Sequence, residues 1–328
     1  MIQACQDITK ADVYHKRCKN KWTFLGSPRW MRSIAALVSA TLIGISGACG
    51  TTDAVGRDPL LERSYNINSI KKDEKIASLL PKKLLEKGEI VMGTNVGYAP
   101  AGFYARDGRT VVGYEIDLNK ALAKLMGLKL NIVNAPFDAI LPSVGSKFDI
   151  GVSGFTVSQE REKAVDFVTY ANAGLLFVVR KGNPTNVSLN NLCGKKVSVQ
   201  VGTTSESQMY SARDLCKARN DQPLDILAFK EQTDATTAVV AGRADVMYAD
   251  TPVSSFAVEQ TDKQLEPLGV SKDKALMGII MQKGDKQLVE AIKAGIEKLI
   301  QTGTYEKIMK AWGVEDIMIQ HPEINPKV

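Results

Sequence analysis

Short apolar runs alternate with segments of helical periodicity from Ile90 onward, and this alternation restricts the possible folds more than any other feature. The intervening segments space their apolar residues three or four positions apart, as an amphipathic helix does. Asp117 is the predicted N-cap of the first helix, and Gly127 its predicted end. Strands that alternate with helices predict a mostly parallel sheet covered by helices. In this first series the predicted strands are residues 90–94, 130–135, 149–154 and 173–179, and the predicted helices are residues 117–127, 137–147 and 159–165.

A second series of the same kind follows a break at Arg180–Pro184, where Gly, Asn and Pro favour a turn. Another break, at Gly284–Asp285, precedes two amphipathic helices over residues 286–303 and 304–313. The chain is therefore predicted to form two α/β lobes. In this second series the predicted strands are residues 196–202, 226–230 and 244–249, and the predicted helices are residues 236–242 and 253–260.

The basic charge of the chain is concentrated at its N-terminus. The first 48 residues contain seven lysine and arginine residues and two aspartates, whereas the rest of the chain contains 35 basic and 34 acidic residues. A nearly neutral body gives no electrostatic reason to bind nucleic acid or an anionic membrane surface. The two histidines, His15 and His321, lie outside the predicted lobes, which removes most chemistry that depends on imidazole. We expect no cofactor and no metal.

The N-terminal segment has the pattern of a secretory signal. Arg29 and Arg32 flank the start of an uncharged run that ends in small residues before Cys49. This ending resembles a bacterial lipobox, after which Cys49 would be lipidated, although Ser46 stands where leucine is more common. An uncleaved membrane anchor is the alternative, but the glycines and low apolar content of the run argue against it.

Cysteine usage agrees with export. Cys5 and Cys18 precede Met31, which is better placed than Met1 to start a signal peptide, so the first 30 residues could be an over-long start. Cys193 and Cys216 are then the two cysteines of the exported body. Such a pair predicts a disulfide, and two unrelated buried thiols are the alternative.

The segment Gly151–Tyr170 places an arginine where an anion could bind. A short strand leads into a turn with Thr156, and a helix is predicted to begin near Gln159 with Arg161 in its first turn. In open α/β sheets, ligands bind where strand ends meet helix starts, and helix N-termini favour anions. A guanidinium adds a planar charged group suited to a carboxylate. By itself, however, an arginine flanked by two glutamates is more often a solvated surface charge.

Six segments, in order along the chain, resemble those of the family 3 extracellular solute-binding proteins, the polar amino-acid receptors of ABC importers. The resemblance covers most of the chain after about residue 88 and implies a two-lobed type II periplasmic-binding-protein fold. Each lobe would be a mostly parallel sheet covered by helices, with the chain crossing twice between lobes and the C-terminal helices packed on the first. The segments are residues 90–104, 112–127, 151–170, 195–207, 242–252 and 302–313.

The resemblance also implies a division of the chain. Residues 50–75 are polar, without a sustained apolar period, and are predicted to be a tether. The predicted parts are residues 1–48 as leader and signal peptide, 49–88 as lipidated cysteine and tether, 89–181 with 276–317 as lobe 1, 182–275 as lobe 2, and 318–328 as a tail.

A free amino acid carries a carboxylate and an ammonium, and each needs an opposite charge in a dry cleft. The resemblance implies that Arg161 binds the carboxylate and Asp250 the ammonium. The Thr156 hydroxyl and the Gly154 carbonyl would face the ligand from the first lobe. Thr204, with its backbone N–H, would hold the carboxylate from the second.

Other roles stay open for these side chains. Thr204 could cap the helix that follows it, and Asp250 could cap residues 251–260. Tyr98 and Phe137 match positions where the family sandwiches the ligand's side chain. Phe137 could instead pack only in the core, as a hydrophobic staple.

Two amides bear on selectivity. Asn95 stands where relatives that bind basic amino acids or glutamine often carry an aspartate, and Gln200 lies on the strand that approaches the pocket from the second lobe. Because no charge is added at either place, we predict a ligand with a polar, uncharged side chain.

The resulting prediction is a monomeric receptor that closes around a free amino acid and delivers it to a membrane permease. The same fold also serves exported enzymes, so a cyclohexadienyl- or arogenate-type dehydratase is the alternative. Such an enzyme would need a carboxylate-only mechanism, in which Glu115 or Asp138 could act, although both also fit the role of helix-start groups. A sensor ectodomain would require a membrane-spanning helix after the lobes, and residues 318–328 are polar.

Overall fold

The computed structural model describes residues 58–327. The predicted leader, signal peptide and lipidated Cys49 lie outside these residues. Within them, no helix is long and apolar enough to cross a membrane.

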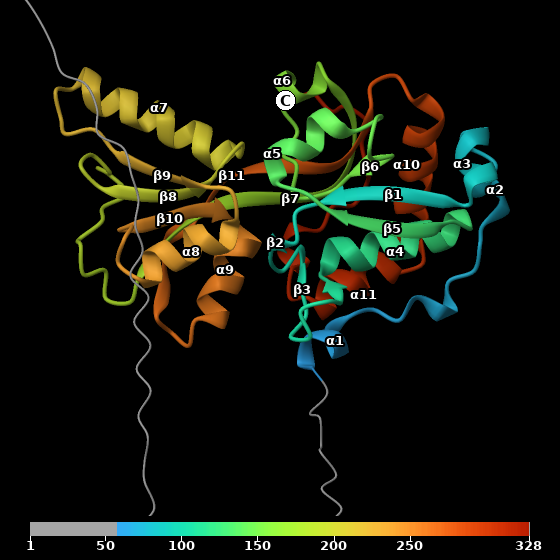
Figure 1. Cartoon of the computed structure of the whole chain (residues 1–328), viewed down its shortest axis with the longest axis horizontal. Helices are drawn as coiled ribbons and strands as arrows, with labels where there is room; N and C mark the ends of the chain where they lie inside the picture. Colours follow the sequence, from blue (N-terminus) through green and yellow to red (C-terminus); the bar gives the residue numbers. More distant parts are fainter. Residues whose placement is uncertain (1–57, 328) are drawn as a thin grey trace, which may run out of the picture. The chain divides into compact units, whose positions relative to one another are not determined.

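One mixed sheet of eight strands organises the described residues (Figure 1). A second, three-stranded sheet is formed by β2 (Gly97–Tyr98), β3 (Gly102–Tyr104) and β4 (Val111–Val112). In sheet order, the eight strands are β5 (Lys129–Asn134), β1 (Glu89–Thr94), β6 (Ile150–Gly151), β11 (Leu265–Gln282), β7 (Val165–Arg180), β10 (Val246–Asp250), β8 (Lys196–Gln200) and β9 (Asp225–Phe229).

Helices flank the strands in both halves of the sheet (Figure 1). The predicted helix over residues 137–147 ends early, and Pro142 and Gly145 account for this because they interrupt a helical backbone. The helices are α1 (Pro59–Arg63), α2 (Glu74–Ala77), α3 (Lys82–Lys87), α4 (Tyr114–Met126), α5 (Phe137–Ile140), α6 (Gln159–Glu162), α7 (Thr204–Ala218), α8 (Gln232–Val240), α9 (Thr251–Gln260), α10 (Lys286–Gln301) and α11 (Thr304–Ala311), with 3-10 turns at Ile67–Ser69, Leu141–Ser143 and Glu315–Ile317.

Two long antiparallel strands, β7 and β11, join the two halves of the sheet. At one end, β11 pairs with β6, which continues through β1 to β5. At the other end, β7 pairs with β10, which continues through β8 to β9. Apart from these two strands, each half contains parallel pairs, so the chain has the predicted α/β architecture and crosses twice between its halves. The boundaries predicted near residues 181 and 275 fall just after β7 and within β11, and they stay a prediction.

The C-terminal helices α10 and α11 pack against α4. On α10, Leu288, Ile292 and Ile296 recur every four residues and are buried, which is the pattern of an amphipathic helix. A Cβ atom on Gly295 would come within 2.7 Å of the Leu122 side chain, so the small residue lets α10 approach α4 closely.

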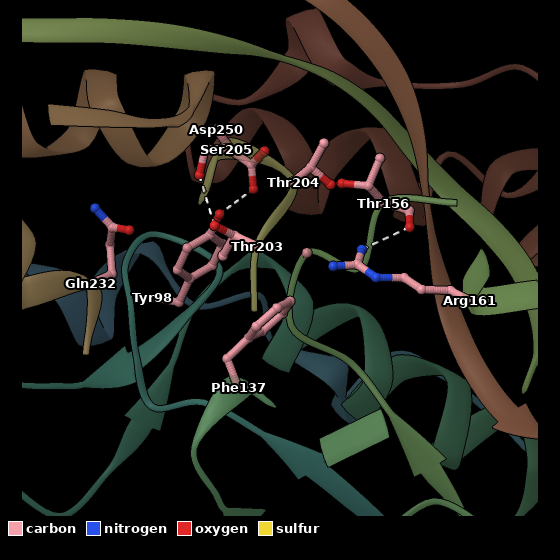
Figure 2. Close-up of a pocket in the computed structure, with 10 residues that line it drawn as sticks. Tyr98, Phe137, Thr156, Arg161, Thr203, Thr204, Ser205, Gln232 and Asp250 are labelled. Carbon is pink, nitrogen blue, oxygen red and sulfur yellow. Dashed lines mark hydrogen bonds between the residues drawn. The ribbon is translucent and has the colours of Figure 1, made fainter. Parts of the chain in front are cut away.

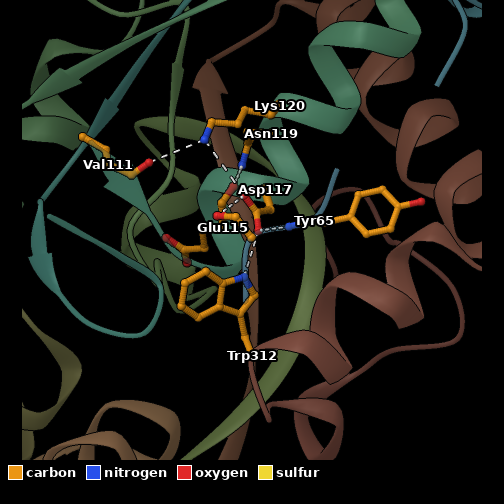
Figure 3. A network of polar contacts seen from close by, with 8 residues as sticks. Tyr65, Val111, Glu115, Asp117, Asn119, Lys120 and Trp312 are labelled. Atoms are coloured by element: carbon orange, nitrogen blue, oxygen red, sulfur yellow. Dashed lines mark hydrogen bonds and ion pairs between the residues drawn. The ribbon is translucent and has the colours of Figure 1, made fainter. Parts of the chain in front are cut away.

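Asp117 does not cap α4, contrary to the prediction. The helix begins one turn earlier, at Tyr114, after Gly113 with a φ of 138°. A Cβ atom at Gly113 would lie 2.1 Å from the Ala101 carbonyl oxygen, so only glycine fits there. Asp117 is instead buried within the helix and accepts hydrogen bonds from Trp312 Nε1 at 2.9 Å and Tyr65 N at 2.8 Å (Figure 3).

The segment before β1 differs from the free tether predicted for residues 50–75. Its described part forms α1, a 3-10 turn and α2, and its backbone is bonded to the body of the protein. Tyr65 N donates to the buried carboxylate of Asp117, and Asp73 N donates to the Leu125 carbonyl at 2.8 Å. Tyr65, Ile67 and Ile70 also pack against the hydrophobic core, so the described part of this segment is fixed to the body of the protein.

The predicted disulfide between Cys193 and Cys216 is present and confirms the pairing. It links the loop before β8 to the C-terminal part of α7, and Cys216 is buried in the core of that half with Val197 and Val199.

Candidate functional site

A narrow pocket lies between the two halves (Figure 2). Seven of the nine predicted ligand residues line it, whereas Asn95 and Gln200 do not. The sequence prediction missed three lining residues, Thr203, Ser205 and Gln232. The seven predicted residues are Tyr98, Phe137, Gly154, Thr156, Arg161, Thr204 and Asp250.

Arg161 turns into the pocket and is not a solvated surface charge. Its helix, α6, begins at the N-cap Ser158, whose hydroxyl accepts from Arg161 N at 3.3 Å. The guanidinium donates to the Thr156 carbonyl at 2.9 Å and, across the pocket, to the Gly202 carbonyl at 3.0 Å. Desolvation by burial lowers the pKa of Arg161 from its ordinary value. Within residues 58–327 no carboxylate forms an ion pair with it, so its charge is available to an anion.

Asp250 enters the pocket from the other half, at the end of β10. It occupies the N-cap position of α9, but its side chain accepts no capping hydrogen bond. Instead the Tyr98 hydroxyl donates to its carboxylate. Burial raises the pKa of Asp250 to about 6, because a charged carboxylate is costly in a desolvated site. The group is therefore a buried anion that lacks a cationic ion-pair partner among the described residues.

Gly154 lines the pocket close to Asp250 in a left-handed conformation, with a φ of 63°. A Cβ atom there would lie 3.0 Å from the Tyr98 ring and 3.4 Å from Asp250 Oδ2. Glycine therefore satisfies two requirements, the positive φ and the close approach of the backbone to the pocket.

The N-terminus of α7 forms the wall of the pocket opposite Arg161's own half. Thr203, not Thr204, is the N-cap, and its hydroxyl accepts from Glu206 N at 3.2 Å. Thr204 is the first helical residue and lines the pocket next to Ser205 (Figure 2). The start of a helix of this length presents free N–H groups, which favour an anionic ligand group.

Aromatic rings form the remaining walls. Tyr98 comes from β2 and Phe137 from the first turn of α5, and both line the pocket (Figure 2). Phe137 also stacks on Phe155, with ring centroids 4.7 Å apart. Both roles considered for Phe137, lining the pocket and packing in the core, therefore occur together.

The two amides that were expected to contact the ligand lie behind the pocket lining and bond to each other. Gln200 Nε2 donates to Asn95 Oδ1 at 3.2 Å, and Asn95 Nδ2 donates to Glu231 Oε2 at 2.9 Å. A carboxylate, Glu231, thus lies beside Asn95, and the prediction from the two amides did not take it into account. Glu231 was not predicted from the sequence because it lies 136 residues from Asn95. The two side chains come into contact only when the two halves pack together.

Beneath the pocket, Glu115 supports the Gly154 loop. Its Oε1 accepts from Gly154 N at 2.8 Å and from the Tyr170 hydroxyl, while Oε2 is buried without a hydrogen-bond partner. Burial raises the pKa of Glu115 to about 7, and the nearby charge of Asp250 adds to the effect. Although Glu115 belongs to the first turn of α4, it does not line the pocket.

This shift predicts how stability depends on pH. The pKa of Glu115 is about 7 in the fold against 4.5 when unperturbed, so between these values the folded state binds more protons than the unfolded state. The free energy of unfolding should therefore fall as pH rises from 4.5 to 7, by at most about 1.4 kcal/mol per pH unit for this one group. Urea unfolding of the ligand-free protein at pH 5, 6.5 and 8 measures the slope.

The matched variant for this prediction is Glu115→Gln, which keeps the acceptor for Gly154 N but cannot ionise. It should flatten the slope without abolishing it, because burial also raises the pKa of Asp250 and Asp117. An unchanged slope in the variant would show that Glu115 titrates normally in the fold.

Similar proteins identify the family of this chain. The model of the bacterial extracellular solute-binding proteins, family 3, matches residues 90–315. The chain belongs to this family. It is 34% identical over 252 residues to the arginine-binding protein ArgT of Corynebacterium glutamicum, an alignment that covers 76% of this chain and 82% of ArgT.

Solved structures of amino acid-binding proteins are also similar to this chain. An ancestral arginine-binding protein bound to arginine is 35% identical, with a TM-score of 0.63, and the match covers 69% of this chain and 98% of that structure. The ancestral amino acid-binding protein AncCDT-1, a precursor of cyclohexadienyl dehydratase, is 32% identical, with a TM-score of 0.64, and the match covers 72% and 99%. The fold and the family are thus established independently.

Proposed function

We propose that this protein binds a free α-amino acid between its two halves and delivers it to the permease of an ABC importer. The observation that carries the proposal is the pairing of opposite charges in one pocket: Arg161 enters from one half and Asp250 from the other. An α-amino acid presents a carboxylate and an ammonium at its α-carbon, so it can neutralise both. The ancestral arginine-binding relative, whose structure contains arginine, supports the same class of ligand.

Binding and closure are coupled by this placement. Arg161, Thr156 and Tyr98 belong to the half with α4, whereas Thr204 and Asp250 belong to the half with α7. Neither half alone satisfies both ends of the ligand, so the ligand stabilises the arrangement in which the halves approach. A permease could then distinguish loaded from empty protein by the spacing of the halves.

The family acts outside the cytoplasm, as its name states. A signal peptide, lipidation of Cys49 and anchoring to the cell membrane complete the proposal for this chain. The proposal includes a protein that acts as a monomer.

The ligand's side chain is proposed to be polar. Asn95 and Gln200 predicted an uncharged side chain, and glutamine or asparagine would fit that prediction. Glu231, beside Asn95, raises a second possibility within the same site, a side chain with a positive charge.

A dehydratase is the second candidate, favoured by one relative and one observation. AncCDT-1 is an amino acid-binding protein and a precursor of a dehydratase. Here Asp250 lines the pocket, with a pKa raised to about 6 that would suit a general acid. Its contact with Tyr98 and its position opposite Arg161 suit an ammonium partner equally well, and we favour binding without chemistry.

Thermal unfolding of the purified protein with each of the twenty amino acids tests the proposal. A ligand at about 100 times its Kd should add roughly 2.7 kcal/mol to the free energy of unfolding and raise the Tm by about 5–10 °C. Arogenate and prephenate belong in the same series, with product formation followed by absorbance. A protein that no amino acid stabilises would contradict the proposal, and turnover of either acid would favour the enzyme.

A further inference from the structure

The carboxylate of Glu231 lies beside Asn95 and Gly97, just outside the lining of the pocket. It precedes α8, next to Gln232, which lines the pocket. Figure 2 shows Gln232 and Arg161 on opposite sides of Tyr98. An amino acid whose α-carboxylate is bound by Arg161 can therefore extend its side chain toward Glu231.

The negative charge of Glu231 is not balanced by a basic ion-pair partner within the described residues. None of the ion pairs formed by residues 58–327 includes it, and its side chain is partly buried. At the pocket and directly beside it there are then three carboxylates, Asp250 in the lining with Glu115 and Glu231 behind it, and one cation, Arg161. The α-carboxylate and α-ammonium of a ligand cancel each other, so a ligand with a neutral side chain leaves the excess negative charge in place. A cationic side chain removes it, and burial makes this difference large.

The N–H groups of the two neighbouring amides, Asn95 and Gln200, already donate hydrogen bonds within the protein. Gln200 Nε2 donates to Asn95 Oδ1 and to the Lys230 carbonyl at 3.0 Å, and Asn95 Nδ2 donates to Glu231 and to the Ala135 carbonyl at 3.3 Å. Gln200 is fully buried, yet its Oε1 has no hydrogen-bond partner. Beside the pocket there are therefore two acceptor groups, Gln200 Oε1 and the Glu231 carboxylate, while the donors of Asn95 and Gln200 are already bonded.

The backbone makes room for the carboxylate. A Cβ atom on Gly97 would lie 2.6 Å from Glu231 Oε2, closer than atoms can pack. Because Gly97 has no side chain, the Glu231 carboxylate can lie beside Asn95.

We propose that Glu231 is a specificity-determining residue that selects amino acids with a cationic, donor-rich side chain, foremost a guanidinium. This rests on the proposed amino-acid function and deepens it. A guanidinium carries five N–H donors in one plane, enough for a carboxylate and a separate amide oxygen. An ammonium such as that of lysine matches the charge but not the planar geometry, and an uncharged amide leaves the carboxylate uncompensated. Asn95 is then a positioning residue that orients Glu231.

Citrulline gives a direct test, because it has the shape of arginine with an uncharged urea in place of the guanidinium. Isothermal titration of the full chain with arginine, lysine, citrulline and glutamine compares wild type with Glu231→Gln. Wild type should bind arginine at least about tenfold more tightly than citrulline, and the variant should lose roughly tenfold to 100-fold in arginine affinity. Its affinity for citrulline should change by less than about threefold.

Two further variants make the result specific. Asp234→Asn removes an exposed carboxylate from the first turn of the same helix and should leave all four affinities unchanged. Gly97→Ala should displace the Glu231 carboxylate and weaken arginine more than citrulline, even if Glu231→Gln folds poorly. Equal affinities of wild type for arginine and citrulline, with no selective effect of Glu231→Gln, would overturn the inference while Arg161-dependent binding of an uncharged amino acid kept the proposed function intact. If no amino acid binds, both are overturned.

Discussion

Replacement of Arg161 by alanine is expected to reduce amino-acid affinity by at least about 100-fold. The guanidinium would make two charge-assisted hydrogen bonds to the ligand's carboxylate, each worth roughly 1.5–3 kcal/mol. Its removal also deletes the bond to the Gly202 carbonyl that joins the two halves. Isothermal titration with the amino acid that most stabilises wild type measures the loss.

Arg219→Ala is the matched control for this experiment. Arg219 is exposed at the C-terminal end of α7, so its removal changes the net charge equally but leaves the pocket intact. Arg161→Lys should retain part of the affinity, because an ammonium keeps the charge but not the fork of two parallel donors. Unchanged affinity in Arg161→Ala would mean that the carboxylate is bound elsewhere, and the site assignment would fail.

The second large effect is expected for Asp250→Asn. Asparagine has the size of aspartate and can still accept from the Tyr98 hydroxyl, so the variant removes charge with little change in shape. Loss of the anion opposite the ligand's ammonium should weaken binding roughly tenfold to 100-fold. Asp245→Asn is the control: Asp245 accepts from Lys196 N at 2.8 Å, away from the pocket, so its replacement should alter stability and not affinity.

The pH dependence of binding distinguishes a charged Asp250 from a merely polar one. Burial raises its pKa to about 6 in the ligand-free protein, and an ammonium ligand favours the deprotonated form. Binding should therefore release a proton near pH 6, and affinity should fall as pH decreases below that value, by up to about tenfold per pH unit. The Asp250→Asn variant should lack this dependence, and a wild-type affinity that is constant from pH 7.5 to 5 would contradict the assignment.

Local pattern was sufficient for much of the fold. Helix α6 begins at the predicted Gln159, and the disulfide joins the predicted cysteines. The failures occurred where another part of the chain decides the local structure. Strand β11 includes exposed Lys272 and Asp273, which show no strand alternation, and it forms because its backbone pairs with β7 over nearly its whole length.

The start of α4 shows the same limit on a smaller scale. An aspartate before an apolar run is a common capping signal, so Asp117 was predicted to begin the helix. The N-cap is instead Gly113, where the Ala101 carbonyl leaves no room for a side chain. Asp117 is then free to bind Trp312, which lies 195 residues away in the sequence.

The sequence by itself determined which residues carry charge, which carry rings and which segments form helices and strands, because these depend on side-chain chemistry and on spacing over a few residues. Together with the family resemblance, it was sufficient to nominate Arg161 and Asp250. Only the tertiary structure decided which of these groups meet. The pairing of β7 with β11 brings the two halves together, and with them Asp250 to Tyr98, 152 residues apart, and Glu231 to Asn95. Contacts at such separations depend on the packing of the whole domain, which no short segment encodes, and so the carboxylate beside the amides was visible only in the folded protein.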